Sequence, residues 1–278
     1  MFKLRDLDLD RICELNEFLV PQDGLAMVGI RGCLPAKPGA WGREVELEAA
    51  KVDYTHPRCT IILWQPRFGS LAAFPGSTVP HISEIKKAAA NGGRGANCLM
   101  TGCYSYVRGW HRYGSRTAHQ AFRQDGVRPL RRTRDDLTYS LADPVEISNP
   151  GDNLHAGWCD SVDSEYYGSA GCQVVVGRPT RGHWRTFYAE AVAKGQTAFT
   201  YLLLTCRDIK FPQPVVRFGS RGPRTKALQE AMIRGGRLKG PADGVCGPNT
   251  FLSLVQAQGD RDTGVFGVDL ARQIGARW

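Results

Sequence analysis

Runs of apolar residues in the first two thirds of the chain predict β-strands. Residues 59–65 (CTIILWQ) are rich in β-branched and aromatic side chains, and a Pro/Gly turn separates them from residues 70–74 (SLAAF). Two such runs joined by a short turn are typical of a hairpin. Three consecutive valines between Gly171 and Gly177 indicate a buried strand. This part of the chain is therefore expected to be mixed but rich in strands.

Helical periodicity appears in three segments. Residues 82–90 place apolar side chains at helical spacing, and the segment NGGRG at 91–95 would end that helix. Residues 183–194 place aromatic and aliphatic side chains on one face. A first helix is expected at 8–18. The pattern of residues 1–50 predicts nothing further.

A break in the pattern near residues 210–216 divides the chain. Pro212 and Pro214 lie two residues apart, which disfavours a helix and indicates an extended linker. Beyond it, a compact helical pattern runs to the C-terminus. We therefore expect two domains, residues 1–210 and residues 211–278.

Composition and charge restrict the class of protein. The chain has 278 residues, 42% of them hydrophobic and 23% charged, which excludes a disordered or collagen-like chain. No run approaches the roughly 18 apolar residues of a membrane-spanning helix, so no membrane span is expected. The nine cysteines are odd in number and unpatterned, so we expect reduced thiols. The N-terminus lacks the apolar core of a secretory signal.

The net charge is +9, from 36 lysines and arginines against 27 acidic residues. Residues 215–278 hold ten basic against five acidic residues, which concentrates +5 in the C-terminal part. Such an excess indicates an anionic partner. Nucleic acid is the first candidate on charge alone.

The C-terminal part carries two turn motifs, GSRG at 219–222 and DGVCGPNT at 243–250. This stretch resembles the three-helix peptidoglycan-binding module. The matching residues are Gly219, Ser220, Arg221, Gly222, Leu228, Gln229, Asp243, Gly244, Val245, Gly247, Pro248 and Thr250. Arg221 is a candidate for binding stem-peptide carboxylates, which arginine binds in a bidentate manner. The alternative is a generic helical hairpin whose motif residues only form turns.

The segment 153–177 carries the candidate chemistry. His155 precedes Cys172 by 17 positions. Cysteine catalysis needs an imidazole that takes the thiol proton and returns it to a leaving group. Gly171 permits close approach of a substrate, and backbone N–H groups near Gly171 and Cys172 are candidate oxyanion donors.

This segment resembles the signature of the YkuD-type L,D-transpeptidases, a histidine followed after about 14 to 17 residues by Ser/Thr-His-Gly-Cys. The resemblance implies that His155 is the base, that Ser169 and Gly171 hold the motif positions, and that Cys172 is the nucleophile. It also implies that the carbonyl of Ala156 orients the histidine. The chain departs from the pattern at residue 170, where alanine replaces the second histidine, and at residues 173–174.

The resemblance implies an α+β chain, in which a mostly-β sandwich domain precedes a small all-α peptidoglycan-binding domain. It implies peptidoglycan as the partner, cross-linking of stem peptides through a cysteine thioester, and no cofactor. Candidate substrate-binding residues are Trp158, Tyr167, Gln173 and Arg221. The expected site of action is the cell envelope or periplasm, reached after a removed leader or by an unconventional route.

Several alternatives remain open at this point. Cys172 is expected to be a structural thiol if it is simply buried. A metal site formed by His155, Cys159 and Cys172 does not match zinc spacing, so none is expected. The protein is alternatively a peptidoglycan hydrolase, such as a carboxypeptidase, an endopeptidase, a phage lysin or an antibacterial effector. It is otherwise a wall-binding protein without catalysis.

Residues 107–134 hold eight arginines, two histidines and several aromatic residues, against the single acidic residue Asp125. Basic residues interleaved with aromatics suit nucleic acid, but they also suit the rim of a site for an acidic peptide-glycan or a solvated face. With a wall-binding resemblance on the same chain, no nucleic-acid partner is expected.

Overall fold

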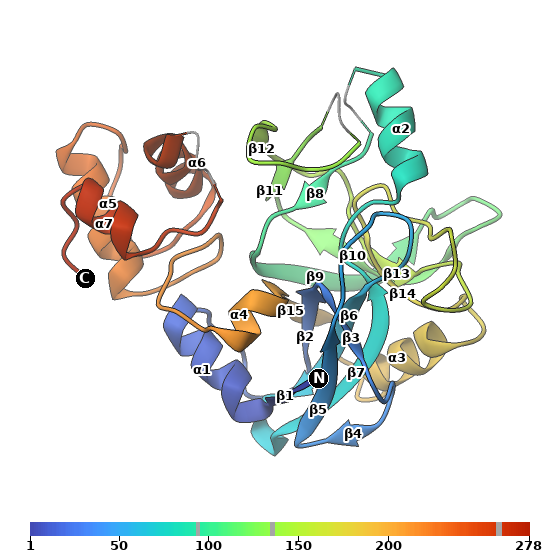
Figure 1. The fold of residues 1–278 in the computed structure, drawn as a ribbon. Coiled ribbons are helices and arrows are strands. Elements are labelled where there is room, and N and C mark those ends of the chain that lie inside the picture. Colours follow the sequence, from blue (N-terminus) through green and yellow to red (C-terminus); the bar gives the residue numbers. More distant parts are fainter. Residues whose placement is uncertain (93–94, 134–136, 260–262) are drawn as a thin grey trace.

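The computed structural model describes residues 1–92, 95–133, 137–259 and 263–278. Within these residues the protein is a mixed α/β structure with fifteen strands and seven α-helices (Figure 1). The strands are β1 (Phe2–Arg5), β2 (Ala26–Arg31), β3 (Cys33–Pro35), β4 (Trp41–Gly42), β5 (Glu44–Ala49), β6 (Cys59–Gln65), β7 (Ser70–Ser77), β8 (Cys98–Leu99), β9 (Gly102–His111), β10 (His119–Asp125), β11 (Arg128–Arg131), β12 (Val145–Ser148), β13 (Leu154–Ala156), β14 (Gln173–Val175) and β15 (Ala198–Thr205). The helices are α1 (Asp6–Asn16), α2 (Ile82–Ala90), α3 (His183–Val192), α4 (Cys206–Lys210), α5 (Pro223–Arg234), α6 (Pro248–Gln258) and α7 (Val268–Gln273).

Eight strands form a closed barrel in the order β14-β13-β10-β9-β15-β2-β6-β7, because β7 pairs back onto β14. The closing contact pairs Val174 with Ser77 and Val175 with Gly76. A Cβ atom at Gly76 would lie 2.1 Å from the carbonyl oxygen of Val174, so only glycine lets the two strands approach here. The β-sandwich that the resemblance implies is not confirmed, since these strands form one sheet that closes on itself.

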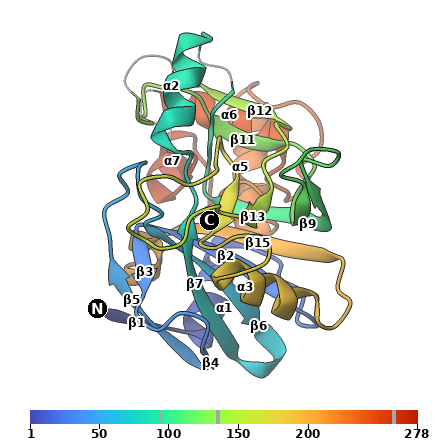
Figure 2. The same ribbon diagram turned by 90° about the vertical axis from the view of Figure 1, so that its right-hand side faces the viewer.

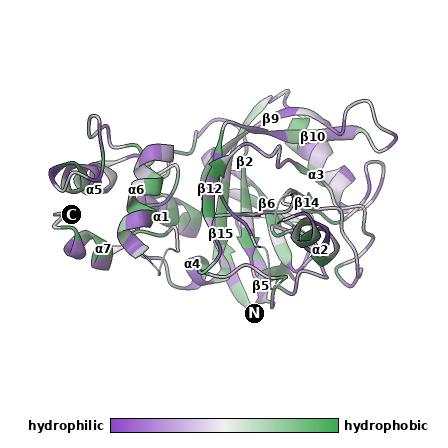
Figure 3. Ribbon diagram, turned by 90° about the horizontal axis from the view of Figure 1, so that it is seen from above, coloured by the Kyte–Doolittle hydropathy of each residue, from purple (hydrophilic) through white to green (hydrophobic). Residues whose placement is uncertain are grey.

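Strands β2, β6, β7 and β15 of the barrel are covered on both faces, which explains their largely continuous apolar sequences. Inside, aromatic residues of β9, β10 and β15 pack with Trp184 and Phe187 of α3. Outside, α1 and the β1-β5-β3 sheet cover β2, β6, β7 and β15. Helices α1 and α3 thus lie on opposite sides of these strands (Figures 1 and 3). Burial on both faces replaces the apolar-polar alternation of a half-exposed strand.

The elements predicted from periodicity are confirmed. Strands β6 and β7 form the expected antiparallel hairpin. Helix α2 spans the predicted 82–90 and lies at the opposite end of the molecule from α1 (Figure 2). Residues 93–94 of its expected terminator lie outside the described residues. Helix α3 ends two residues earlier than predicted, at Val192, and α1 occupies Asp6–Asn16 rather than 8–18.

Helices α5, α6 and α7 gather at one side of the barrel (Figures 1 and 3). Leu228, Phe251 and Phe266 form the centre of their core, which Met100 of the β8–β9 connection also joins. The segment that contains Pro212 and Pro214 has no regular structure, as the sequence predicts. The helical lobe therefore packs against the barrel rather than standing apart from it.

The GSRG turn joins this lobe to the C-terminal end of α1. The carboxylate of Glu17 accepts hydrogen bonds from the backbone N–H of Arg224 (2.7 Å) and of Thr225 (3.0 Å), at the start of α5. Ser220 Oγ donates to the Asn16 carbonyl at 2.6 Å. A Cβ atom at Gly222 would lie 2.5 Å from the Glu17 carboxyl carbon. In this chain the residues of the GSRG motif therefore form a contact between the helical lobe and the C-terminal end of α1.

None of the described helices is long and apolar enough to cross a membrane, as predicted. All nine cysteines lie in the described part of the chain and are free thiols.

Replacement of Glu17 tests the contact between the C-terminal end of α1 and the helical lobe. Glu17→Ala leaves two backbone N–H groups at the start of α5 without their acceptor, one buried and one partly buried, so we expect the free energy of unfolding to fall by about 2–3 kcal/mol. Denaturation in guanidinium chloride measures the change. Glu14→Ala is the matched control, because Glu14 is exposed and its ion pair with Arg11 lies at the surface; it should cost at most about 0.5 kcal/mol. Equal effects of the two substitutions would contradict this role of Glu17.

Candidate active site

Parallel pairing of β13 with β14 places the two predicted catalytic residues together. Leu154 pairs with Gln173 and His155 pairs with Val174, so Cys172 immediately precedes β14 beside the start of β13. A ring nitrogen of His155 and the Sγ atom of Cys172 lie within 4.8 Å of each other. Both side chains are buried, His155 to 2% and Cys172 to 8% exposure. The structure therefore brings together the two residues that the sequence predicts as a catalytic pair.

The turn before Cys172 is fixed by Ser169 and Gly171. Ser169 Oγ donates to the Cys172 carbonyl at 2.7 Å and accepts from the Gly171 N–H at 3.2 Å. Gly171 has a φ of 153°, and a Cβ atom there would lie 2.4 Å from Nδ2 of Asn97, so glycine is required. The sequence predicts that backbone N–H groups near Gly171 and Cys172 are oxyanion donors. In this geometry the Gly171 N–H is already bonded to Ser169, which holds the turn in place.

The hydrogen bonds of His155 decide which ring nitrogen is basic. Its Nδ1 lies 2.8 Å from the carbonyl oxygen of Ala156. A carbonyl only accepts, so Nδ1 carries the proton and Nε2 keeps its lone pair. Nε2 is buried and has no hydrogen-bond partner among the described residues. The contact with Ala156 is the one that the resemblance implies, and it leaves Nε2 as a proton acceptor.

Burial keeps both reacting groups neutral at rest. Burial, together with the nearby Asp152 carboxylate, raises the pKa of the Cys172 thiol to about 12. Burial, with the neighbouring His111 and His119, holds the pKa of His155 well below its usual value. The resting state is therefore a thiol beside a neutral imidazole rather than a thiolate–imidazolium pair.

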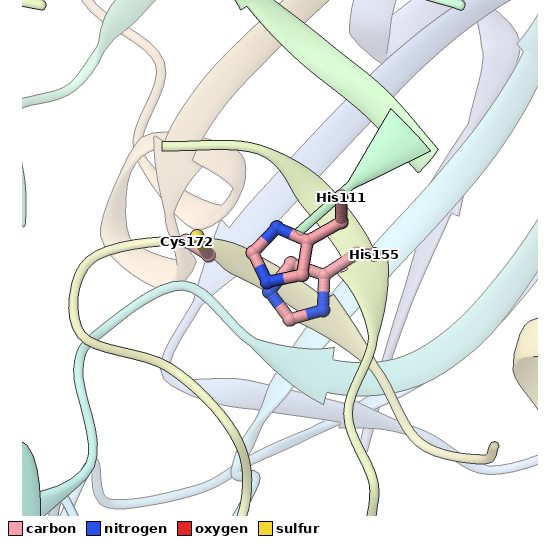
Figure 4. Close-up of side chains that lie close together, drawn as sticks. All are labelled: His111, His155 and Cys172. Carbon is pink, nitrogen blue, oxygen red and sulfur yellow. The ribbon is translucent and has the colours of Figure 1, made fainter. Parts of the chain in front are cut away.

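Two more histidines lie at the site. His111 and His119 face each other across the β9–β10 hairpin. His111 stacks on His155, with ring centroids 3.9 Å apart and planes at 17° (Figure 4). The centroid of His119 lies 5.4 Å from that of His155. The sequence places both histidines only within the arginine-rich segment. Their positions on either side of the turn between β9 and β10 are the signal that would have paired them.

Asn153 connects His111 to Cys172. Its backbone N–H donates to Cys172 Sγ at 3.4 Å. Its side-chain Nδ2 lies 3.0 Å from Nδ1 of His111, and its Oδ1 accepts from the Gln124 N–H at 3.1 Å. No sequence motif singled out Asn153, because its partners come from β9 and β10.

The described residues offer one group of metal-ligand type, formed by His111, His155 and Cys172. One ligand atom from each lies within 4.8 Å of the other two, and mixed sulfur and nitrogen ligands suit zinc. Cys159, the third ligand of the set considered from the sequence, is not in this group; it packs with Tyr167 and Val176.

Two of the four predicted substrate-binding residues lie in the core of the structure, and the other two lie outside it. Tyr167 and Gln173, both predicted to bind substrate, are fully buried. The Tyr167 hydroxyl donates to the Pro80 carbonyl, and Gln173 Oε1 accepts from the Tyr201 hydroxyl. Both side chains are therefore held in the core.

Trp158 and Arg221 lie outside that core. Trp158 is half-buried, has a φ of 58° and meets His119 edge-on at 5.7 Å, beside the site. Arg221 is exposed on the GSRG turn, where its backbone pairs with Val245. Trp158 is thus the one of the four that the structure brings to the histidines.

The arginine-rich segment forms β9, β10 and β11 rather than one solvated face. Arg128 is only 1% exposed, and its guanidinium stacks on the ring of Tyr106 at 4.0 Å. Arg131 is also buried. Residue 134 of this segment lies outside the described residues. At least these two arginines support the fold.

Comparison with known proteins identifies no relative. No family model matches the chain. No curated protein and no solved structure matches it either. Function must therefore be inferred from the site and from the motifs.

The neutral resting pair predicts the pH dependence of thiol alkylation. Because the pKa of Cys172 is raised, its thiolate is a minor species across pH 6–9 and grows about tenfold per pH unit. The rate of iodoacetamide labelling of Cys172, followed by peptide mass spectrometry, should rise with that slope and reach no plateau. A plateau below pH 8 would show a stable thiolate–imidazolium pair and contradict the neutral resting state.

Proposed function

We propose that this protein is a cysteine acyltransferase in which Cys172 is the nucleophile and His155 the general base. The observation that carries the proposal is the Nδ1 contact of His155 with Ala156, which leaves Nε2 as an acceptor without a partner among the described residues, on a ring that has a nitrogen within 4.8 Å of Cys172 Sγ. A buried thiol beside such a lone pair has a base within reach.

The reaction follows from these positions. His155 Nε2 takes the proton of Cys172 as Sγ attacks a carbonyl carbon, and the carbonyl oxygen becomes an oxyanion. The intermediate collapses with cleavage of the C–N bond, and His155 returns the proton to the leaving amine. An acceptor amine then attacks the thioester, His155 takes its proton, and Cys172 leaves and regains a proton. Atoms and charge balance without a cofactor.

The proposed substrate is the stem peptide of peptidoglycan, acted on at the cell envelope. Two independent stretches support it, the His155–Cys172 segment and the motifs at 219–250, which resemble parts of wall-modifying enzymes. The exposed Arg221 and the excess of basic residues after residue 215 suit stem-peptide carboxylates. Residues 1–210 would hold the catalytic domain and 211–278 the wall-binding module.

One observation favours a second function, a wall-binding protein without catalysis. Cys172 is only 8% exposed and its thiol pKa is about 12, as in a structural thiol. Under that alternative the barrel is a scaffold for the helical lobe.

Incubation with purified muropeptides tests the proposal. We expect cross-linked dimers from the native protein and at least about a 10³-fold loss of product with Cys172→Ala, because the thioester then has no nucleophile. Cys159→Ala is the matched control, since Cys159 is a buried thiol outside the His–Cys group; it should retain activity. Mass analysis of the products measures both.

The products separate the alternatives. Dimers support transfer, whereas shortened stems support hydrolysis of the same thioester by water. Full activity of Cys172→Ala would rule out the mechanism. Binding to sacculi without any product would leave only the wall-binding function.

A further inference from the structure

We propose that His111 is a second catalytic residue, whose Nε2–H donates a hydrogen bond to the oxyanion formed when Cys172 attacks. This inference rests on the proposed acyl transfer and adds to it the group that stabilises the developing negative charge. Such donors are worth about 10²–10³ in rate in acyl transfer.

A chain of two hydrogen bonds assigns the proton of His111. The Gln124 N–H can only donate, so the Asn153 side-chain atom that it meets is the oxygen Oδ1. The other arm of that amide is then the donor Nδ2, which lies 3.0 Å from Nδ1 of His111. Nδ1 of His111 must therefore accept, and its proton sits on Nε2. The backbone of β10 thus sets the tautomer of a histidine on β9.

The two stacked imidazoles consequently have opposite tautomers. His155 carries its proton on Nδ1, held by the Ala156 carbonyl, and presents a basic Nε2. His111 presents Nε2–H. Burial, with the charges of His119 and Arg112, lowers the pKa of His111 to about 4, so the ring is a neutral donor at pH 7. One ring accepts the thiol proton and its neighbour donates, which divides the two tasks of acyl transfer.

His111 is also placed to reach a substrate. It is partly exposed, whereas His155 is 2% exposed. Figure 4 shows nitrogen atoms of both stacked rings on the side where Cys172 lies. Ser169 already binds the Gly171 N–H, so one of the backbone donors expected near Gly171 and Cys172 is engaged. A ring nitrogen of His111 lies within 4.8 Å of Cys172 Sγ, which places this imidazole beside the carbon that Cys172 would attack.

The same tautomer argues against a bound metal. A metal ligand must offer a lone pair, but the lone pair of His111 on Nδ1 is used by Asn153 and its Nε2 is protonated. The substitution Asn153→Asp would reverse this. The carboxylate that it introduces would accept from the Gln124 N–H and from Nδ1–H of His111, which frees the Nε2 lone pair, as in carboxylate–histidine–zinc triads.

Asn153→Asp is therefore the decisive variant. We expect long-range ¹H–¹⁵N NMR to show Nε2–H for His111 and Nδ1–H for His155 in the native protein, and Nδ1–H for His111 in the variant. The kcat on muropeptides should fall about 100-fold in the variant with little change in KM, because a donor is lost only in the transition state. Cobalt(II) should give a thiolate charge-transfer band with the variant and not with the native protein.

Three results would overturn the inference. The inference fails if NMR shows that native His111 carries its proton on Nδ1. This result needs no activity measurement and does not depend on whether the variant folds. An active native protein with an Asn153→Asp variant of unchanged kcat would remove the role of His111 and leave the proposed function intact. A native protein without acyl transfer would instead overturn the proposed function, and with it the catalytic role of His111.

Discussion

The structure of the site depends on the double pairing of β14, parallel with β13 and antiparallel with β7. The first pairing sets the register that brings His155 to Cys172, and the second closes the barrel and fixes β14 in place. A slip of one residue would turn the side chain of His155 to the other face of the sheet. Gly76 permits the closure, because any side chain there would collide with the Val174 carbonyl.

At this site, hydrogen bonds to the backbone determine which ring nitrogen of each histidine carries the proton. The Ala156 carbonyl fixes the proton of His155, and the Gln124 N–H fixes that of His111 through Asn153. Burial disfavours charge on both rings and on the thiol. A thiolate therefore forms only as its proton moves, which suits a site that is charged in the transition state and neutral before it.

The sequence predicted those features of the fold and the site that depend on residues close together in the chain. The β6–β7 hairpin, helix α2 and the His155–Cys172 pair are carried by short segments or a fixed spacing. Contacts between distant segments were not predictable. His111 reaches the site through the register of β9, and the closure depends on Gly76 meeting a strand about a hundred residues later. The burial of Tyr167 and Gln173 was not predictable either. The Tyr167 hydroxyl donates to the Pro80 carbonyl, and Gln173 accepts from the Tyr201 hydroxyl, so both partners are distant in the sequence.

The central claim is that Cys172 forms a thioester with its substrate. Acid quenching of the native protein during turnover of excess muropeptide, followed by peptide mass spectrometry, tests it most directly. We predict an acyl adduct on the peptide that contains Cys172, removable by hydroxylamine. Turnover with an unmodified Cys172, or with the adduct on another thiol, would contradict it.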